Sequence, residues 1–224
     1  MEEVTRWINV LSEDLWLDAG CGDGQLADLL GKHKKILGLD IDKQRLIHAQ
    51  TRPYLSLIQG SITSLPFANE SLGGIACIET LEHIVDMPAA LEEFSRCLRP
   101  NGYLVISMPS VTLRSLWQMH RLRKPVYCAQ KEHVRELSFS PIKGFPNRFK
   151  TWAWLERRAS KYGFKSIRKG GVGYLFPMWE GKLARLEYIM NICYLEKVNN
   201  LLGKLPMVRN YPYYCIYMFR LKEK

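Results

Sequence analysis

Apolar side chains recur along the chain in two patterns: short continuous runs bounded by turn residues, and longer stretches with an apolar residue every three or four positions. Short runs are typical of buried strands, and the longer stretches of helices that cover a sheet. The runs predict strands at 14–19, 35–40, 55–59, 73–78, 102–108, 165–169 and 212–220. The stretches predict helices at 3–11, 24–32, 43–50, 87–98, 151–162 and 181–202. Because strands and helices alternate, we expect an α/β fold with a doubly wound, mostly parallel sheet and helices on both faces.

The first predicted strand runs directly into a turn rich in glycine. Gly20, Gly22 and Gly24 permit a tight turn and let the backbone approach a ligand closely. The helix that starts at Gln25 directs its first N–H groups toward this turn. Asp18 precedes the turn, and its carboxylate would repel a pyrophosphate but suits a ligand that carries an ammonium and a sulfonium group. Gln25 also stands where the nicotinamide fingerprint has its third glycine.

A second carboxylate ends the next predicted strand. Asp40 lies twenty residues after Gly20, the spacing at which doubly wound folds hold ribose hydroxyls. A carboxylate has enough lone pairs to accept both hydroxyls of one ribose. Asp42 competes for this role but is better placed as the N-cap of the helix predicted at 43–50. Asp18, the glycine turn and Asp40 together predict a nucleoside site at the carboxyl edge of the sheet.

Residues 14–109 resemble a class I S-adenosylmethionine-dependent methyltransferase, of the group that includes ubiquinone and menaquinone methyltransferases. Besides the glycine turn, three segments carry the resemblance: Ile58-Gln-Gly-Ser61 with Leu65-Pro-Phe67, Ile78-Glu-Thr-Leu-Glu-His-Ile84, and Leu98-Arg-Pro-Asn-Gly-Tyr-Leu-Val-Ile106. The resemblance implies a seven-stranded, Rossmann-like sheet whose last strand is antiparallel. It also implies S-adenosyl-L-methionine as cofactor and S-adenosyl-L-homocysteine as product.

The resemblance assigns the cofactor site residue by residue. Asp18, Gly20 and Gly22 would contact the methionine part, Asp40 the ribose, and Ile41 one face of the adenine. The full set of cofactor residues is Asp18, Ala19, Gly20, Gly22, Asp40, Ile41, Ser61, Ile62 and Glu79. The family usually has an aspartate where this chain has Ser61, so the backbone N–H of Ile62 is a further candidate for the adenine.

The segment after the fourth strand carries three polar side chains. Glu79 would lie beside the transferable methyl and is also a candidate catalytic residue. Leu81 to Ile84 would begin a helix that carries Glu82 and His83 toward the cleft, where His83 would contact substrate. The competing interpretation is structural: both glutamates would cap a helix, and His83 would bond a backbone carbonyl.

The length and composition of the chain are typical of a folded globular domain. A chain of 224 residues with 47% hydrophobic content can bury a sizeable core. We therefore expect a single methyltransferase domain over 1–224, with a cofactor-binding core at 14–109 and substrate-side insertions at 110–150 and 175–210. The start of the sequence lacks signal-peptide features. The six cysteines form no CxxC pair, so neither a zinc or other metal site nor a redox motif is expected. This favours a reducing, cytoplasmic location.

Positive charge is concentrated in one quarter of the chain. The formal net charge is +10, and residues 111–170 hold 15 Lys or Arg against 3 Glu. A focused positive field attracts anions, so we expect an anionic small-molecule or lipid-precursor acceptor. Within this quarter, His133 could take a proton from an acceptor hydroxyl, Arg135 could clamp a carboxylate or phosphate, and Tyr127 is a further catalytic candidate. A merely solvated basic face is the competing interpretation.

Three alternatives stay open at this point. The basic segment could follow RNA phosphates, although the chain lacks the motifs of adenine and cytosine methylating enzymes, so nucleic acid is not favoured. The protein could bind S-adenosylmethionine without catalysis. An apolar helix predicted at 181–202 could cover the pocket, form a homodimer face in place of a monomer, or rest on a membrane surface.

Overall fold

The computed structural model describes residues 1–12, 15–30, 34–109, 152–172 and 214–223. The chain divides into two compact units, and the described residues fall almost entirely within one of them, Met1–Met108, Ala153–Lys169 and Ile216–Lys224. The second unit comprises Pro109–Trp152 and Gly170–Cys215. The insertions predicted at 110–150 and 175–210 and the helix predicted at 181–202 lie outside the described residues, so the single-domain division stays a prediction.

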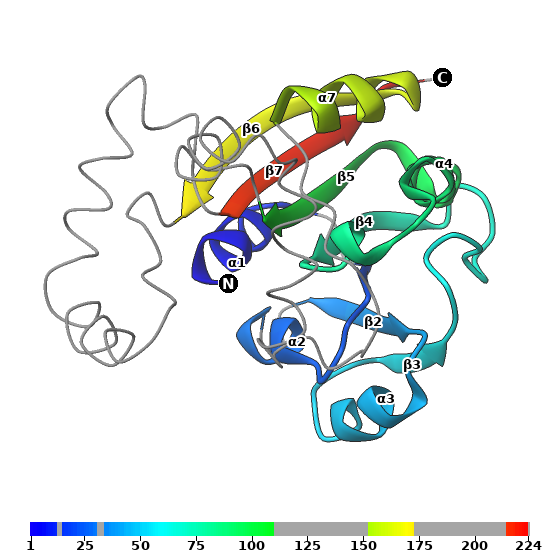
Figure 1. Ribbon diagram of the computed structural model, residues 1–224. Coiled ribbons are helices and arrows are strands. Elements are labelled where there is room, and N and C mark those ends of the chain that lie inside the picture. Colours follow the sequence, from blue (N-terminus) through cyan, green and yellow to red (C-terminus); the bar gives the residue numbers. More distant parts are fainter. Residues whose placement is uncertain (13–14, 31–33, 110–151, 173–213, 224) are drawn as a thin grey trace, which may run out of the picture. The chain divides into compact units, whose positions relative to one another are not determined.

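Seven strands form one sheet (Figure 1), in the order β3-β2-β1-β4-β5-β7-β6. Their bounds are β1 Leu15–Ala19, β2 Lys35–Asp40, β3 Ser56–Gln59, β4 Leu72–Ile78, β5 Leu98–Pro109, β6 Phe164–Val172 and β7 Tyr214–Leu221. The pairs β1–β2, β2–β3, β1–β4 and β4–β5 are parallel. Figure 1 shows β7 running opposite to β5 and β6. The predicted doubly wound, mostly parallel sheet with an antiparallel last strand is therefore confirmed.

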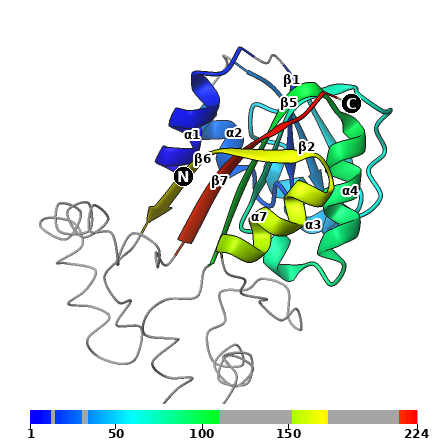
Figure 2. The ribbon, with the colours of Figure 1, turned by 90° about the horizontal axis from the view of Figure 1, so that it is seen from above.

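Helices cover both faces of this sheet. Their bounds are α1 Glu2–Asn9, α2 Gln25–Leu30, α3 Lys43–Ala49, α4 Met87–Cys97 and α7 Trp152–Lys161, with a short 3₁₀ helix η2 at Leu81–His83. Figure 2 shows α1 and α2 on one side of the sheet, with α4 and α7 on the other. Strand order reverses between β1 and β4, and in such sheets the ligand crevice opens at the carboxyl ends of the strands beside this reversal. None of the described helices is long and apolar enough to cross a bilayer.

The core lies between the central strands and the helices. Trp7, Ile8 and Trp16 are among its fully buried side chains. The indole of Trp16 lies directly over Gly74, its register partner on β4, where an added Cβ would approach the ring to 2.5 Å. Such close packing requires glycine at this position, next to the strand reversal.

The structure corrects two predicted boundaries. β5 begins at Leu98 rather than 102, because Leu98 ends α4 in an extended conformation and pairs with Leu72 across an irregularity in the register. The helix expected to begin at Leu81–Ile84 is only the single turn of η2, since Ile84 is extended. A new helix then starts after Asp86, whose side chain accepts a 3.0 Å hydrogen bond from the N–H of Ala89.

Candidate active site

The carboxyl ends of four parallel strands bring the candidate residues to one edge of the sheet. Asp18 lies in β1, Asp40 ends β2, Ser61 follows β3, and Glu79 follows β4. Asp18 and Asp40 are close enough for the Asp40 charge to raise the pKa of Asp18. The sequence-based expectation that these positions share an edge is thus met by the topology, although the role of each side chain stays a prediction.

The glycine turn lies against β2 and against Thr80 in the segment after β4. The N–H groups of Gly20 and Cys21 both donate to the carbonyl of Leu39, at 2.7 and 3.0 Å. Gly20 and Gly22 have φ values of 84° and 53°, in the left-handed region where L side chains are strained. A Cβ at Gly20 would also lie only 2.3 Å from Cγ2 of Thr80. The turn therefore depends on glycine for both conformation and space.

Asp40 is fixed by two backbone donors. Its Oδ2 accepts from the N–H of Gly22 at 2.8 Å, and its Oδ1 accepts from the N–H of Asp42 at 2.9 Å. Each oxygen keeps a second lone pair that can accept a ligand hydroxyl. Asp42 is the N-cap of α3, as predicted, and its side chain accepts from Gln44 N–H. Ile41 next to it is 62% exposed, so its apolar side chain is accessible for stacking on a ring.

Asp18 is almost completely buried and has a partner that sequence reasoning missed. The hydroxyl of Tyr54 donates a 2.6 Å hydrogen bond to Oδ2 of Asp18. Burial raises the pKa of Asp18 to about 7, the Tyr54 bond opposes this rise, and the Asp40 charge adds to it. A cation bound beside Asp18 would favour its ionised form. No local pattern marks Tyr54, because its contact joins residues 36 positions apart.

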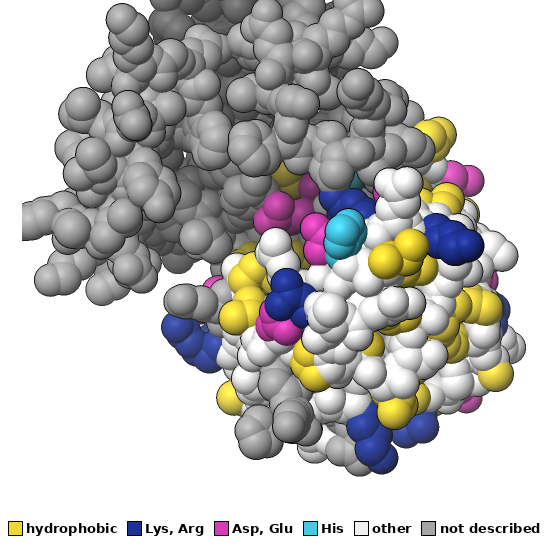
Figure 3. All heavy atoms as spheres, turned by 90° about the horizontal axis from the view of Figure 1, so that it is seen from below, with side chains coloured by type: hydrophobic (Ala, Val, Ile, Leu, Met, Phe, Trp, Pro, Cys, Tyr) yellow, Lys and Arg dark blue, Asp and Glu magenta, His cyan; other side chains and the backbone are white. Residues whose placement is uncertain are grey.

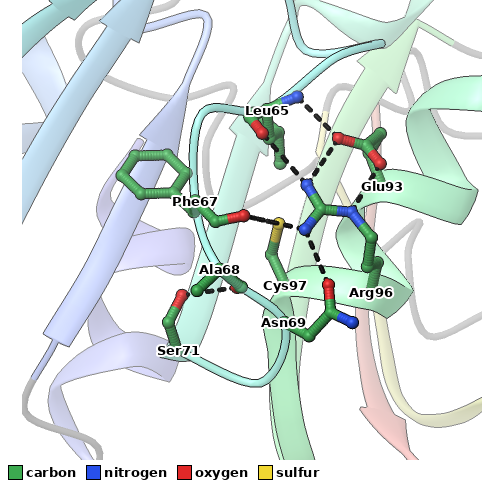
Figure 4. A network of polar contacts seen from close by, with 8 residues as sticks. All are labelled: Leu65, Phe67, Ala68, Asn69, Ser71, Glu93, Arg96 and Cys97. Atoms are coloured by element: carbon green, nitrogen blue, oxygen red, sulfur yellow. Dashed lines mark hydrogen bonds and ion pairs between the residues drawn. The ribbon is translucent and has the colours of Figure 1, made fainter.

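The loop after β3 is fastened to α4 by a charged network (Figure 4). Glu93 Oε2 accepts from the N–H of Leu65 at 2.6 Å, and Arg96 donates to the carbonyls of Leu65 and Phe67 at 3.0 and 2.7 Å. Arg96 also forms a two-pronged ion pair with Glu93. This network fixes the loop that carries Ser61 and Ile62.

Within that loop, Ser61 is already engaged locally. Its Oγ shares a 2.8 Å hydrogen bond with Oγ1 of Thr63 and accepts one from the N–H of Thr63. Ile62 is buried, with 4% of its surface exposed. The Ser61 side chain therefore supports the loop, and an adenine contact there stays a prediction.

The segment after β4 places two carboxyl groups in different surroundings. Glu79 has a left-handed backbone, φ 51°, and donates its N–H to the carbonyl of Ser107 at 2.9 Å. Its side chain reaches solvent, yet desolvation by neighbouring protein atoms raises its pKa. Glu82 is buried, its Oε2 has no hydrogen-bond partner, and burial raises its pKa to about 8. Among the described residues, no group of His, Cys, Asp and Glu is arranged to hold a metal ion.

Arg45 and His83 bring unpaired nitrogen atoms to the same region. A Cβ at Gly22 would lie 2.8 Å from Nη1 of Arg45, so the guanidinium lies against the glycine turn. Burial lowers the pKa of His83, and the charge of Arg45 lowers it further. Arg45 Nε and His83 Nδ1 are buried without a partner. Figure 3 shows a face of the described part on which acidic, basic and histidine side chains gather. The sequence analysis did not single out Arg45.

The remaining candidates cannot be placed. His133, Tyr127 and Arg135 all lie outside the described residues. Their assignment to catalysis or substrate binding therefore stays a prediction from sequence.

Residues 17–106 match the family model described as "Methyltransferase domain". The chain is 32% identical over 96 residues to a probable S-adenosylmethionine-dependent methyltransferase from Mycolicibacterium smegmatis, a match that covers 42% of this chain and 37% of that protein's length. It is 30% identical over 199 residues to the chloroplastic 2-phytyl-1,4-beta-naphthoquinone methyltransferase of Arabidopsis thaliana, covering 77% of this chain and 74% of that one.

A solved structure from Thermotoga maritima, an S-adenosylmethionine-dependent methyltransferase described as a possible histamine N-methyltransferase, superposes with a TM-score of 0.64. It covers 99% of this chain and 86% of its own, and because the sequence identity is 16%, it supports the fold alone. The long match to the Arabidopsis protein, the methyltransferase domain match and the shared sheet agree. The chain therefore belongs to the class I S-adenosylmethionine-dependent methyltransferases, enzymes whose methyl donor is S-adenosylmethionine.

Proposed function

We propose that the protein transfers the methyl group of S-adenosylmethionine to a small-molecule acceptor that is anionic or carries an acidic, quinol-like hydroxyl. The main support for this proposal is a pair of buried carboxylates, Asp18 and Asp40, beside the glycine turn. One carboxylate is held in place by two backbone donors, and the other has a pKa raised to about 7 by burial, so that a bound cation would favour its ionised form.

The described residues fit this cofactor. Asp40 offers free lone pairs for ribose hydroxyls, and Ile41 offers an exposed apolar surface for adenine. Asp18 has one oxygen that does not receive the Tyr54 hydrogen bond, and this oxygen suits the ammonium of the methionine part. Ala19, Gly20 and Gly22 would contact the same part through their backbone, and Ser61 and Ile62 would border the adenine.

The chemistry requires little from the protein beyond alignment and exclusion of water. When bound, S-adenosylmethionine supplies a methyl group on a sulfonium, which a nucleophile displaces in line. A hydroxyl acceptor must also lose its proton. Glu79, at the end of β4, and His133, from the basic quarter, are the groups we assign to receive or orient that proton, with Tyr127 as a further candidate.

Two observations support an anionic acceptor, one from the described residues and one from the sequence of the basic quarter. Arg45 Nε and His83 Nδ1 are unpaired near the turn, and residues 111–170 hold most of the basic excess, including Arg135. A deprotonated quinol carries its charge on the reacting oxygen, and the Arabidopsis relative is named for a naphthoquinone. An RNA acceptor and binding without catalysis remain the alternatives to be tested.

We also propose a cytoplasmic location. The four cysteines in the described part of the chain are free and buried, as expected in a reducing compartment. A monomer or homodimer, and contact with a membrane surface, stay predictions.

The proposal is tested in two steps with the full chain. Calorimetric titration with S-adenosylhomocysteine should show one saturable site. Labelled methyl donor should then transfer label to a prenylated naphthoquinol or a hydroxybenzoate, and not to total RNA. Label in RNA alone would refute the acceptor class. Binding without transfer to either small molecule or RNA would favour a non-catalytic protein.

A further inference from the structure

Tyr54 reaches the cofactor site from a loop that the function does not otherwise use. The loop joins α3 to β3, and the N–H of Leu55 donates to the carbonyl of Ile36 on β2 at 2.7 Å, which anchors its backbone. The ring lies between two glycines. A Cβ at Gly24 would lie 3.0 Å from Cε2 of Tyr54, and a Cβ at Gly38 would lie 3.1 Å from Cε1. The ring thus packs closely against both glycines, beside Arg52 at Gly24 and Leu57 at Gly38.

The hydroxyl of that ring ends at the buried carboxyl of the site. It donates to Asp18 Oδ2 at 2.6 Å, a short distance typical of a hydroxyl bound to a carboxylate. Asp18 is 2% exposed, so few orientations of its carboxyl are open to it. Because Oδ2 already accepts this bond, we assign Oδ1 as the main acceptor for the ammonium group of a ligand.

Four titratable groups face Asp18 from the surrounding elements. Tyr54 comes from the loop before β3, Asp40 from β2, Cys21 from the turn and Cys77 from β4. Burial raises the pKa of both thiols, so they stay neutral at physiological pH. Burial also raises the pKa of Tyr54, which keeps its proton available for donation. Asp40 opposes the charge on Asp18, and Tyr54 is the neighbour that favours it.

We propose that Tyr54 is a positioning residue that turns the Asp18 carboxylate toward the ammonium group of the methyl donor. This inference rests on the proposed contact between Asp18 and the methionine part of the cofactor. Removal of the Tyr54 hydroxyl lets the Asp18 carboxylate change its orientation and raises its pKa. The loss of affinity should therefore affect only ligands with an amino-acid part. It should also be largest at low pH, where Asp18 more readily takes a proton.

The variant Tyr54→Phe keeps the ring between the two glycines and removes only the donor. Calorimetry between pH 6 and 8.5 compares S-adenosylhomocysteine with methylthioadenosine, which has the same nucleoside but no amino-acid part. We expect affinity for S-adenosylhomocysteine to fall about tenfold near pH 6.5, as for a lost charge-assisted hydrogen bond, and the deficit to shrink toward pH 8.5. Affinity for methylthioadenosine should be unchanged.

Two controls separate the possible outcomes. Tyr103→Phe removes a tyrosine hydroxyl from β5, where the ring lies beneath Arg220, and it should change the affinity for neither ligand. In an Asp18→Asn background, Tyr54→Phe should cost no further affinity. Equal loss for both ligands at every pH would mean that Tyr54 only supports packing, and no loss for either would also overturn the inference. Failure of the unaltered protein to bind S-adenosylhomocysteine would instead overturn the proposed function.

Discussion

Glu82 offers a direct test of the electrostatics at this site, through the variant Glu82→Gln. The carboxyl is 2% exposed, its Oε2 has no partner, and burial, with a smaller contribution from Glu79, raises its pKa to about 8 against an ordinary value of 4.5. Between these two pH values the folded protein keeps a proton on Glu82 that the unfolded chain has released. Stability therefore falls as the pH rises through this window, and it levels off above the folded pKa.

The size of the effect follows from the difference between the two pKa values. Each pH unit corresponds to about 1.4 kcal/mol, so the whole window sets an upper bound of about 5 kcal/mol. Water entry and small rearrangements soften burial penalties, and we expect a measured loss of about 2–4 kcal/mol from this group. Glutamine has nearly the same shape and no charge at any pH. Glu82→Gln should therefore lose less stability than the unaltered protein between pH 5 and 8.5.

Urea unfolding of cofactor-free protein at several pH values measures this slope. Asp18 titrates in the same direction in both proteins, so the comparison isolates Glu82. The matched control is Glu92→Gln, an exposed position on α4, which should leave the slope unchanged. If the Glu82 variant and the unaltered protein showed the same pH dependence, the buried proton would not exist and the reasoning would be refuted.

Three further variants test the turn and its supports. Asp40→Ala should weaken binding of S-adenosylhomocysteine at least about tenfold by calorimetry, because two ribose hydrogen bonds are lost; unchanged affinity would discredit the ribose assignment. Gly20→Ala should abolish cofactor binding and lower the melting temperature, since a Cβ would lie 2.3 Å from Thr80 Cγ2. Adding Thr80→Ser should not restore binding, because the φ of 84° at residue 20 remains unfavourable for alanine. Arg96→Ala should destabilise the protein by about 2–3 kcal/mol in urea unfolding, since Glu93 and two loop carbonyls lose their donor; a loss below about 0.5 kcal/mol would show that the network is only a surface ion pair.

Most of the sheet could be predicted because buried parallel strands leave continuous apolar runs. The observed β1, β2 and β4 agree with the predicted runs to within a residue, since each is bounded by turn residues. The hydrophobic pattern assigned Leu98 to the preceding helix, because an apolar residue there continues the helical spacing. Its pairing with Leu72 shows that it belongs to β5. The start of α4 after Asp86 agrees with the helix predicted from residue 87, whereas the helix expected to begin at Leu81–Ile84 is only the single turn of η2.

The cofactor side of the site was marked in the sequence because its residues follow directly after strands. Asp18, Gly20 and Asp40 owe their positions to the ends of β1 and β2, which meet at one edge in a parallel sheet. Tyr54 and Arg45 carry no such signal. Their side chains reach the turn from a loop and a helix face, and contacts of that kind have no local pattern. The acceptor side, including His133, lies outside the described residues and stays at the level of prediction.

The three hydrogen bonds that tie the glycine turn to Leu39 and Asp40 are all internal to the protein. The turn and the Asp40 carboxylate are therefore held in place by contacts within the protein, and a ligand at the proposed site would spend none of its affinity on ordering them. Small fragments such as adenosine should consequently be retained well for their size. An inhibitor campaign could begin with such a fragment and grow toward the acceptor side, where selectivity among related enzymes would have to be found.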